Sequence, residues 1–212
     1  MPTKKSVVRE YFESLVIAVS LALFVRTFVF QAFKIPTGSM EPNLLVGDHL
    51  IVNKMVFAPT ATGFERAILP HRDIHRGDVI VFKYPENPDR DFIKRTIGLP
   101  GETVEIRDKA VYINGQPLEQ AAYHLKFKPR SDDARLDPKA LNWGPATVPA
   151  GHLFMMGDNR DDSADSRFWG FLPISYVKGR AMTIYFSYDP DATGAASLLT
   201  SIRWGRLFRQ VH

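Results

Sequence analysis

The hydrophobic residues of this 212-residue chain follow one pattern near the N-terminus and a different one over the rest. Residues 14–30, with the sequence SLVIAVSLALFVRTFVF, form an apolar run that contains one charged residue, Arg26. As an α-helix that rises about 1.5 Å per residue, this run spans roughly 26 Å, close to the thickness of the hydrocarbon core of a membrane. The pattern therefore predicts one membrane-spanning helix from Ser14 to Phe30.

Arg26 is the unfavourable residue in this run, because a cation at the centre of a bilayer costs about 2.5–3.5 kcal/mol on insertion scales. It lies toward the C-terminal end of the run, where its stem lets the guanidinium reach the lipid headgroups. A cleaved signal sequence is the alternative, since Leu15 to Val25 has a suitable length and Ser20-Leu21-Ala22 resembles a cleavage site. That site lies inside the apolar run, which continues past Arg26 to Phe33, so we favour a retained anchor.

Short runs that alternate between apolar and polar residues follow the anchor, and this alternation is typical of β-strands. Asp108-Lys109 and Asn114-Gly115 mark turns between neighbouring runs. The predicted strands cover residues 49–54, 78–84, 91–95, 103–107, 110–113, 152–156 and 180–186. Fifteen prolines and fourteen glycines also favour short strands and turns over a helical bundle. We predict a mainly β fold, with folded antiparallel sheets or a partly open barrel and one N-terminal transmembrane helix.

Two stretches interrupt this alternation, and we interpret both as surface loops. They are residues 57–76 and 119–149, which are rich in Pro, Thr, Arg and Asp. The chain is expected to divide into a cytoplasmic N-terminus and anchor, residues 1–33, and an extracytoplasmic β domain, residues 34–212. The orientation follows from the basic residues that precede the anchor, because positive charge next to a membrane helix stays in the cytoplasm.

The formal net charge of +4 suits an anionic partner, either nucleic acid or an acidic lipid surface. Its distribution favours lipid. Lys4, Lys5 and Arg9 precede the apolar run, and residues 203–209 combine three arginines with Trp204, Leu207 and Phe208. No motif for stacking bases accompanies these residues, so we do not expect nucleic acid as a partner. The chain has no cysteine, which excludes disulfides, thiol nucleophiles and zinc held by cysteine.

Ser39 is a candidate nucleophile, in the segment Ile35-Pro36-Thr37-Gly38-Ser39-Met40-Glu41-Pro42 directly after the anchor. Gly38 lets the backbone turn sharply, so that the Ser39 hydroxyl is exposed. Serine in a turn that contains proline and glycine is more often structural. Residue types alone therefore do not assign Ser39 a role.

A serine nucleophile needs a base, and none of the six histidines lies in a recognisable triad motif. His71 and His75 have a spacing that would suit zinc on a helix, but no glutamate lies between them, and we predict no metal site. Lysine can replace histidine if burial lowers its pKa from about 10.4 toward neutrality. Lys94 fits this requirement best because it follows Phe92 and Ile93 in a predicted strand, although that segment alone favours an outward-facing lysine.

Residues 157–170, GDNRDDSADSRFWG, form the third unusual segment. Their acidic start resembles a calcium-binding loop, but the spacing and the final glutamate of an EF-hand are missing. We expect a compact loop, cross-linked by Asp/Arg pairs, that can hold hydroxyl groups rigidly over a site.

Together these segments resemble the bacterial type I signal peptidase family, in which a serine and a lysine form the catalytic dyad. The resemblance covers the turn around Ser39 and residues 47–54, 76–82, 91–102 and 157–170, in this order. It implies a membrane-bound serine endopeptidase that removes N-terminal signal peptides from secreted pre-proteins after an Ala-x-Ala-like site. The implied location is the bacterial inner membrane, crossed once, with residues 34–212 as the catalytic domain on the periplasmic side. Pre-proteins and membrane lipid are the implied partners, and no cofactor is expected.

The resemblance also implies roles for individual residues. Ser39 would be the nucleophile and Lys94 the general base, while Ser163 would hydrogen-bond and orient the lysine. Asp165 and Arg167 would form an ion pair that braces the loop.

The oxyanion hole would consist of the Ser39 N–H and the hydroxyl of Thr37, where the family often has serine. Asp162 stands where the family often has asparagine, without an obvious catalytic consequence. Shallow apolar pockets for small substrate side chains are expected near six residues: Phe33, Ile35, Met40, Leu44, Phe92 and Ile93.

Two other functions stay open at this point. One is a non-enzymatic β module, tethered to the membrane, that binds lipid or a partner through its basic tail and exposed apolar surface. The other is a serine–lysine peptidase of narrower duty, which matures a single conjugation or pilus subunit.

Overall fold

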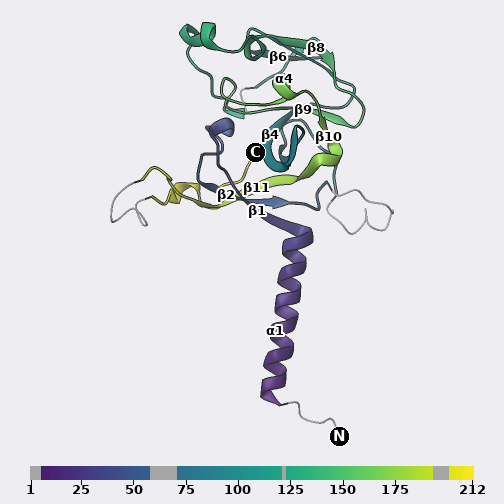
Figure 1. Cartoon of the computed structure of the whole chain (residues 1–212), viewed down its shortest axis with the longest axis vertical. Helices are drawn as coiled ribbons and strands as arrows, with labels where there is room; N and C mark the ends of the chain where they lie inside the picture. The colour runs from purple at the N-terminus through teal and green to yellow at the C-terminus, as the bar shows by residue number, and fades with distance from the viewer. Residues whose placement is uncertain (1–5, 58–70, 121–122, 193–200) are drawn as a thin grey trace.

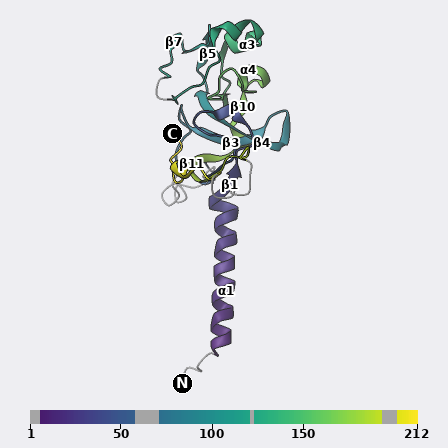
Figure 2. The same ribbon diagram turned by 90° about the vertical axis from the view of Figure 1, so that its left-hand side faces the viewer.

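The structure is a computed structural model that describes residues 6–57, 71–120, 123–192 and 201–212. One long N-terminal helix projects from a β domain that contains the rest of the described chain, as two perpendicular views show (Figures 1 and 2). The two parts meet at strand β1 (Phe30–Lys34), which follows the helix without a loop.

The N-terminal helix consists of α1 (Val7–Phe24) and a π-helical turn, η1 (Val25–Val29). Ser6 caps its start, because the side chain accepts a hydrogen bond from the Arg9 N–H. This helix of 23 residues is long enough and apolar enough to cross a membrane, and none of its residues is buried against the β domain. The predicted helix is therefore present, but it begins at Val7 rather than Ser14. It ends at Val29, since Phe30 has the extended backbone of a strand.

Seven strands form the larger sheet, in the order β1-β2-β11-β3-β4-β9-β10. Besides β1 they are β2 (Asp48–Asn53), β3 (Val79–Tyr84), β4 (Asn87–Gly98), β9 (His152–Met156), β10 (Leu172–Pro173) and β11 (Val177–Ser187). The smaller sheet has the order β7-β6-β5-β8 and consists of β5 (Thr103–Arg107), β6 (Ala110–Ile113), β7 (Gln116–Pro117) and β8 (Trp143–Thr147). All pairings between these strands are antiparallel, which confirms the predicted fold class, and the sheets are not closed into a barrel.

All seven predicted strands are present, and β1, β7, β8 and β10 are additional. Short helical elements complete the described fold: η2 (Gly38–Met40), η4 (Arg130–Arg135), α3 (Pro138–Leu141), α4 (Ser166–Trp169), η5 (Ile174–Tyr176) and η6 (Trp204–Arg206). The stretch 119–149, predicted as a loop, contains three of these elements, η4, α3 and β8. Residues 58–70 of the other predicted loop, and 121–122 of this one, lie outside the described residues.

The core beneath the Ser39 turn is formed where η2 packs on the sheet. Its buried side chains come from the turn, β2, β3, β11 and the C-terminal segment, and include Ile35, Met40, Leu44, Leu50, Val79, Ala181, Ile184 and Val211. Met40 and Leu44, which we expected to line substrate pockets, are 0% and 1% exposed. Their side chains face inward and pack in the core beneath the turn.

Candidate active site

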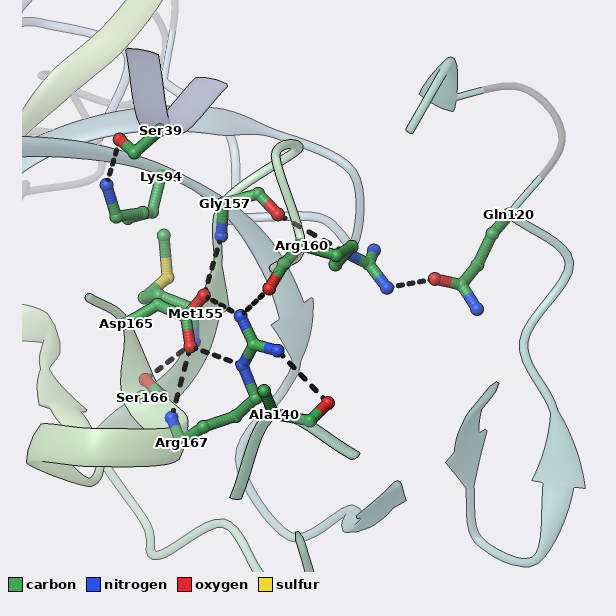
Figure 3. Close-up of polar contacts among 10 residues, drawn as sticks. All are labelled: Ser39, Lys94, Gln120, Ala140, Met155, Gly157, Arg160, Asp165, Ser166 and Arg167. Carbon is green, nitrogen blue, oxygen red and sulfur yellow. Dashed lines mark hydrogen bonds and ion pairs between the residues drawn. The ribbon is translucent and has the colours of Figure 1, made fainter. Parts of the chain in front are cut away.

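Ser39 and Lys94 lie 55 residues apart in the sequence but touch in the structure. Ser39 is the middle residue of the tight turn η2, and Lys94 lies in β4, opposite Ile80 of β3. Lys94 Nζ donates a hydrogen bond to Ser39 Oγ at 2.5 Å (Figure 3). The Lys94 ammonium group also lies 5.4 Å from the centre of the Phe92 ring. The fold therefore places the candidate base directly on the candidate nucleophile.

Lys94 is almost completely removed from solvent, with 4% of its surface exposed. Burial lowers the pKa of Lys94 from 10.5 to about 8, because a charged ammonium loses its hydration in the interior. The carboxylates of Asp165 and Asp158 act in the opposite direction, and the nearby charge of Arg167 adds to the lowering. Roughly a tenth of Lys94 is therefore uncharged at pH 7 and able to accept a proton, far more than for a lysine of ordinary pKa.

The loop between β9 and α4 is hydrogen-bonded to the Ser39 turn. Asn159 donates from its backbone N–H to the Ser39 carbonyl oxygen and from its side chain to the Gly38 carbonyl oxygen, both at 3.1 Å. A Cβ atom on Gly157 would lie 2.5 Å from the Ser39 carbonyl oxygen, so only glycine permits this close approach. Sequence reasoning gave no role to Asn159, although it lies in the segment that we had singled out.

Ser163 lies beside the same turn, but the hydrogen bond to Lys94 that the resemblance implies is not present. The Ser163 Oγ atom is buried and has no hydrogen-bond partner among the described residues. It packs instead against Gly157, where a Cβ atom would lie 2.3 Å from it. The hydrogen bond of Lys94 Nζ goes to Ser39 instead.

The structure brings Asp165 and Arg167 together as a buried ion pair with two parallel hydrogen bonds. Arg167 donates from Nε to Asp165 Oδ1 and from Nη2 to Asp165 Oδ2, both at 2.8 Å (Figure 3). Asp165 also accepts from the Gly157 N–H at 3.1 Å and caps the start of α4. Arg167 Nη2 donates to the Arg160 carbonyl oxygen. These contacts fix both ends of the loop that holds Asn159 and Ser163.

A second buried ion pair, which the sequence did not reveal, joins β4 to the beginning of the loop. Arg95 donates from Nε and Nη2 to the two carboxylate oxygens of Asp158, both at 2.7 Å. Asn43 adds a hydrogen bond of 2.8 Å to Asp158 from the segment that follows the Ser39 turn. Because Arg95 follows Lys94 directly, this pair connects the strand of the candidate base to both the loop and the turn.

A cleft of about 340 Å³ opens over Ser39 and Lys94. Turn residues 36–39, β4 residues 90–94, Asp162 and Ala164 form its walls, so Thr37, Phe92 and Ile93 all face it. A much smaller pocket of about 30 Å³ adjoins β4, and its lining includes Phe33 and Ile35. Four of the six predicted pocket residues therefore line one or both of these hollows.

The edge of β4 beside the cleft is available to another extended chain. β3 pairs with β4 from Asn87 to Arg95, whereas β9 pairs on the other side only at Arg95, Thr96 and Gly98. Residues 90–94 therefore have no second neighbour among the described strands on the side of the cleft. An unpaired edge of this kind can bind a peptide as an added strand. Within the described residues, no group of three or more His, Cys, Asp or Glu side chains is arranged to hold a metal.

Comparisons with known proteins give a consistent result. The model of the family described as signal peptidase, peptidase S26, matches residues 8–186. The signal peptidase I of Pseudomonas aeruginosa is 36% identical over 220 residues, which cover 89% of this chain and 75% of that protein. The signal peptidase I of Leptolyngbya laminosa is 40% identical over 192 residues, which cover 87% of this chain and 83% of that protein. A solved structure of a signal peptidase I from Enterococcus faecalis is 36% identical, covers 51% of this chain and 97% of its own, and gives a TM-score of 0.42.

Proposed function

Since the chain belongs to the signal peptidase family, peptidase S26, we propose that it removes signal peptides with a catalytic dyad of Ser39 and Lys94. Membership of this family makes the chain a serine peptidase of the type I signal peptidase class, and it favours an enzyme over a non-enzymatic membrane module. The proposal for the dyad rests on one observation. Lys94 Nζ lies 2.5 Å from Ser39 Oγ and is buried in a site that lowers its pKa to about 8.

In the proposed reaction, uncharged Lys94 accepts the proton of the Ser39 hydroxyl while Ser39 Oγ attacks the carbonyl carbon of the scissile bond. The bond from that carbon to the peptide nitrogen then breaks. The ammonium of Lys94 returns its proton to the departing amine, and the acyl group stays on Ser39. Water then gives a proton to Lys94 and attacks the carbonyl carbon of the ester. The bond from that carbon to Ser39 Oγ breaks, and Lys94 returns the proton to Ser39 as the acid product leaves. Both attacks, by Ser39 and by water, need Lys94 to be uncharged at their start, and burial favours this uncharged form.

Thr37 and the Ser39 N–H are the proposed donors to the oxyanion. Thr37 lines the cleft two residues before Ser39, and this supports its hydroxyl as the second donor. Ser163 is proposed to orient Lys94 once substrate has displaced the ammonium group from Ser39. Its buried, unpaired hydroxyl supports this role, because a buried group without a partner costs about 1–3 kcal/mol and gains by pairing.

The dimensions of the site support a preference for small side chains before the cut. A substrate paired with residues 90–94 of β4 directs alternate side chains toward the sheet, because neighbouring residues of a strand point to opposite faces. The pocket beside Ile35 and Ile93, about 30 Å³, is by far the smaller of the two hollows, which supports a preference for side chains as small as a methyl group. We therefore propose cleavage after an Ala-x-Ala-like sequence.

The proposed location is the bacterial inner membrane, with residues 1–33 as the cytoplasmic end and anchor and residues 34–212 as the periplasmic domain. The apolar helix ends at Val29, and β1 begins at the next residue, so the sheet that carries the cleft starts at the membrane surface. The basic residues before the helix support a cytoplasmic N-terminus. Contact with lipid and the emerging pre-protein follows from this placement.

The experiment is cleavage of one labelled pre-protein with an Ala-x-Ala site by the full chain in lipid. We expect Ser39→Ala and Lys94→Ala each to abolish cleavage while the circular dichroism spectrum stays unchanged. Lys83→Ala is the matched control, because Lys83 is an exposed strand lysine outside the cleft. Full activity of Lys94→Ala would rule out the dyad. Cleavage of only one pre-protein in a panel would favour the peptidase of narrower duty.

A further inference from the structure

Asp162 is the one residue of the segment 161–163 whose side chain is exposed, and it forms part of the cleft wall. Its neighbour Asp161 turns away and binds Lys109 at 2.9 Å, whereas Ser163 is buried. The Asp162 N–H donates to the Asn159 carbonyl oxygen, and Asn159 is itself bonded to the Ser39 turn. This chain of contacts fixes the backbone of Asp162 next to the nucleophile.

The Asp162 carboxylate has no hydrogen bond or ion pair with any described residue, so its charge stays available in the cleft. Two other charged residues, besides Lys94, line the same cleft. Asp91 is already paired with Lys178 at 2.7 Å. Arg90 lies over the Phe92 ring, 5.7 Å from its centre. It precedes Lys94 by four residues, which is roughly 13 Å along a strand at about 3.3 Å per residue.

The positions of these charges determine which part of a substrate each one meets. On the proposed function, residues before the cut lie along β4 toward Arg90, because the small pocket that receives them is lined by residues 91–93. The scissile bond lies at Ser39, and the chain after the cut leaves in the other direction. Asp162 and Ala164 line the same cleft from the loop that is bonded to the Ser39 turn, and not from β4, along which the residues before the cut lie.

We propose that Asp162 is a specificity-determining residue that selects substrates by the charge of the first residues after the cut. A lysine or arginine there is attracted to the free carboxylate, and an aspartate or glutamate is repelled. Two unit charges about 4 Å apart in bulk water change an affinity about fivefold. The preference is therefore moderate, and salt weakens it because the cleft is open to solvent.

The test compares three versions of one pre-protein that differ only in the first residue after an Ala-x-Ala site, which is Lys, Gln or Glu. For the full wild-type chain in lipid at low salt, we expect kcat/KM to fall about fivefold from Lys to Gln and again from Gln to Glu. Asp162→Asn should bring the three values within about twofold of one another. High salt should also bring the three wild-type kcat/KM values close together, because it screens the charge of Asp162. This measurement tests the proposal without a variant.

Asp73→Asn is the matched control, since Asp73 is exposed and lies outside the cleft. It should keep the wild-type order of the three substrates. The inference is overturned if Asp162→Asn keeps the wild-type order, or if wild-type preference is the same at low and high salt. Ser39→Ala tests the dyad separately. It should be inactive on all three substrates, and this result does not depend on whether Asp162 selects among them.

Discussion

The burial of Lys94 has a cost in stability that can be measured directly. Its pKa falls from 10.5 to about 8 in the folded protein, and each pKa unit corresponds to about 1.4 kcal/mol. The difference amounts to about 3 kcal/mol by which the charged form is less stable in the fold than in the unfolded chain. Lys94→Met removes the ammonium group and keeps a flexible apolar side chain of similar size. We therefore expect this variant to be inactive but about 3 kcal/mol more stable at pH 7.

The direction of the pH dependence follows from proton binding. Between pH 8 and 10.5 the unfolded chain holds a proton on Lys94 that the folded chain has released, so wild-type stability rises through this range. Below pH 8 both states are protonated and the full cost is present. The advantage of Lys94→Met should therefore be largest below pH 8 and should approach zero near pH 10.5.

The assay is urea unfolding of the full chain in detergent micelles, followed by tryptophan fluorescence at several pH values. Lys83→Met is the control, because Lys83 is exposed on β3 and its replacement should change stability by less than about 0.5 kcal/mol. A Lys94→Met variant that is no more stable than wild type at pH 7 would refute the reasoning. An advantage that stays constant from pH 7 to pH 10.5 would also refute it.

Three further predictions concern residues around the dyad. Thr37→Ser should retain activity, whereas Thr37→Val should lower kcat about 10²–10³-fold, because it removes one oxyanion donor. Steady-state kinetics of both variants will measure this difference. Ser163→Ala should lower kcat without destabilising the fold, because the hydroxyl has no partner to lose; a loss of stability above about 1 kcal/mol would contradict its unpaired state. Asp165→Asn should destabilise the fold by about 3–5 kcal/mol, measured by urea unfolding, because Arg167 would keep a buried charge without its partner; a near-neutral effect would contradict the buried pair.

The strands that the sequence predicted correctly are those whose alternation is visible within a few residues. β5, β6 and β9 match their predicted ranges to the residue, because their side chains alternate between core and surface. β1 was missed because its apolar residues directly continue those of the membrane helix, and nothing in composition marks the change of backbone at Phe30. β8 was missed because Gly144 and Pro145 are typical of turns.

The candidate site depends on long-range contacts that local patterns do not encode. One example is the packing of Met40 and Leu44 into the core beneath the Ser39 turn, which the local sequence does not show. The burial of Lys94 is another, since it arises where β4 meets the Ser39 turn and the loop after β9. From the sequence, only the combination of segments shared with a family brought Ser39 and Lys94 together.

The dependence of kcat/KM on pH tests the proposed dyad most directly, because it reports the ionisation of the free enzyme's essential base. With a pre-protein substrate whose own charge is constant over the range, we expect kcat/KM to rise tenfold per pH unit at low pH and to level off with a midpoint near pH 8. A midpoint above pH 10, or a rate that does not change between pH 6 and 10, would contradict a buried, uncharged Lys94 acting on Ser39.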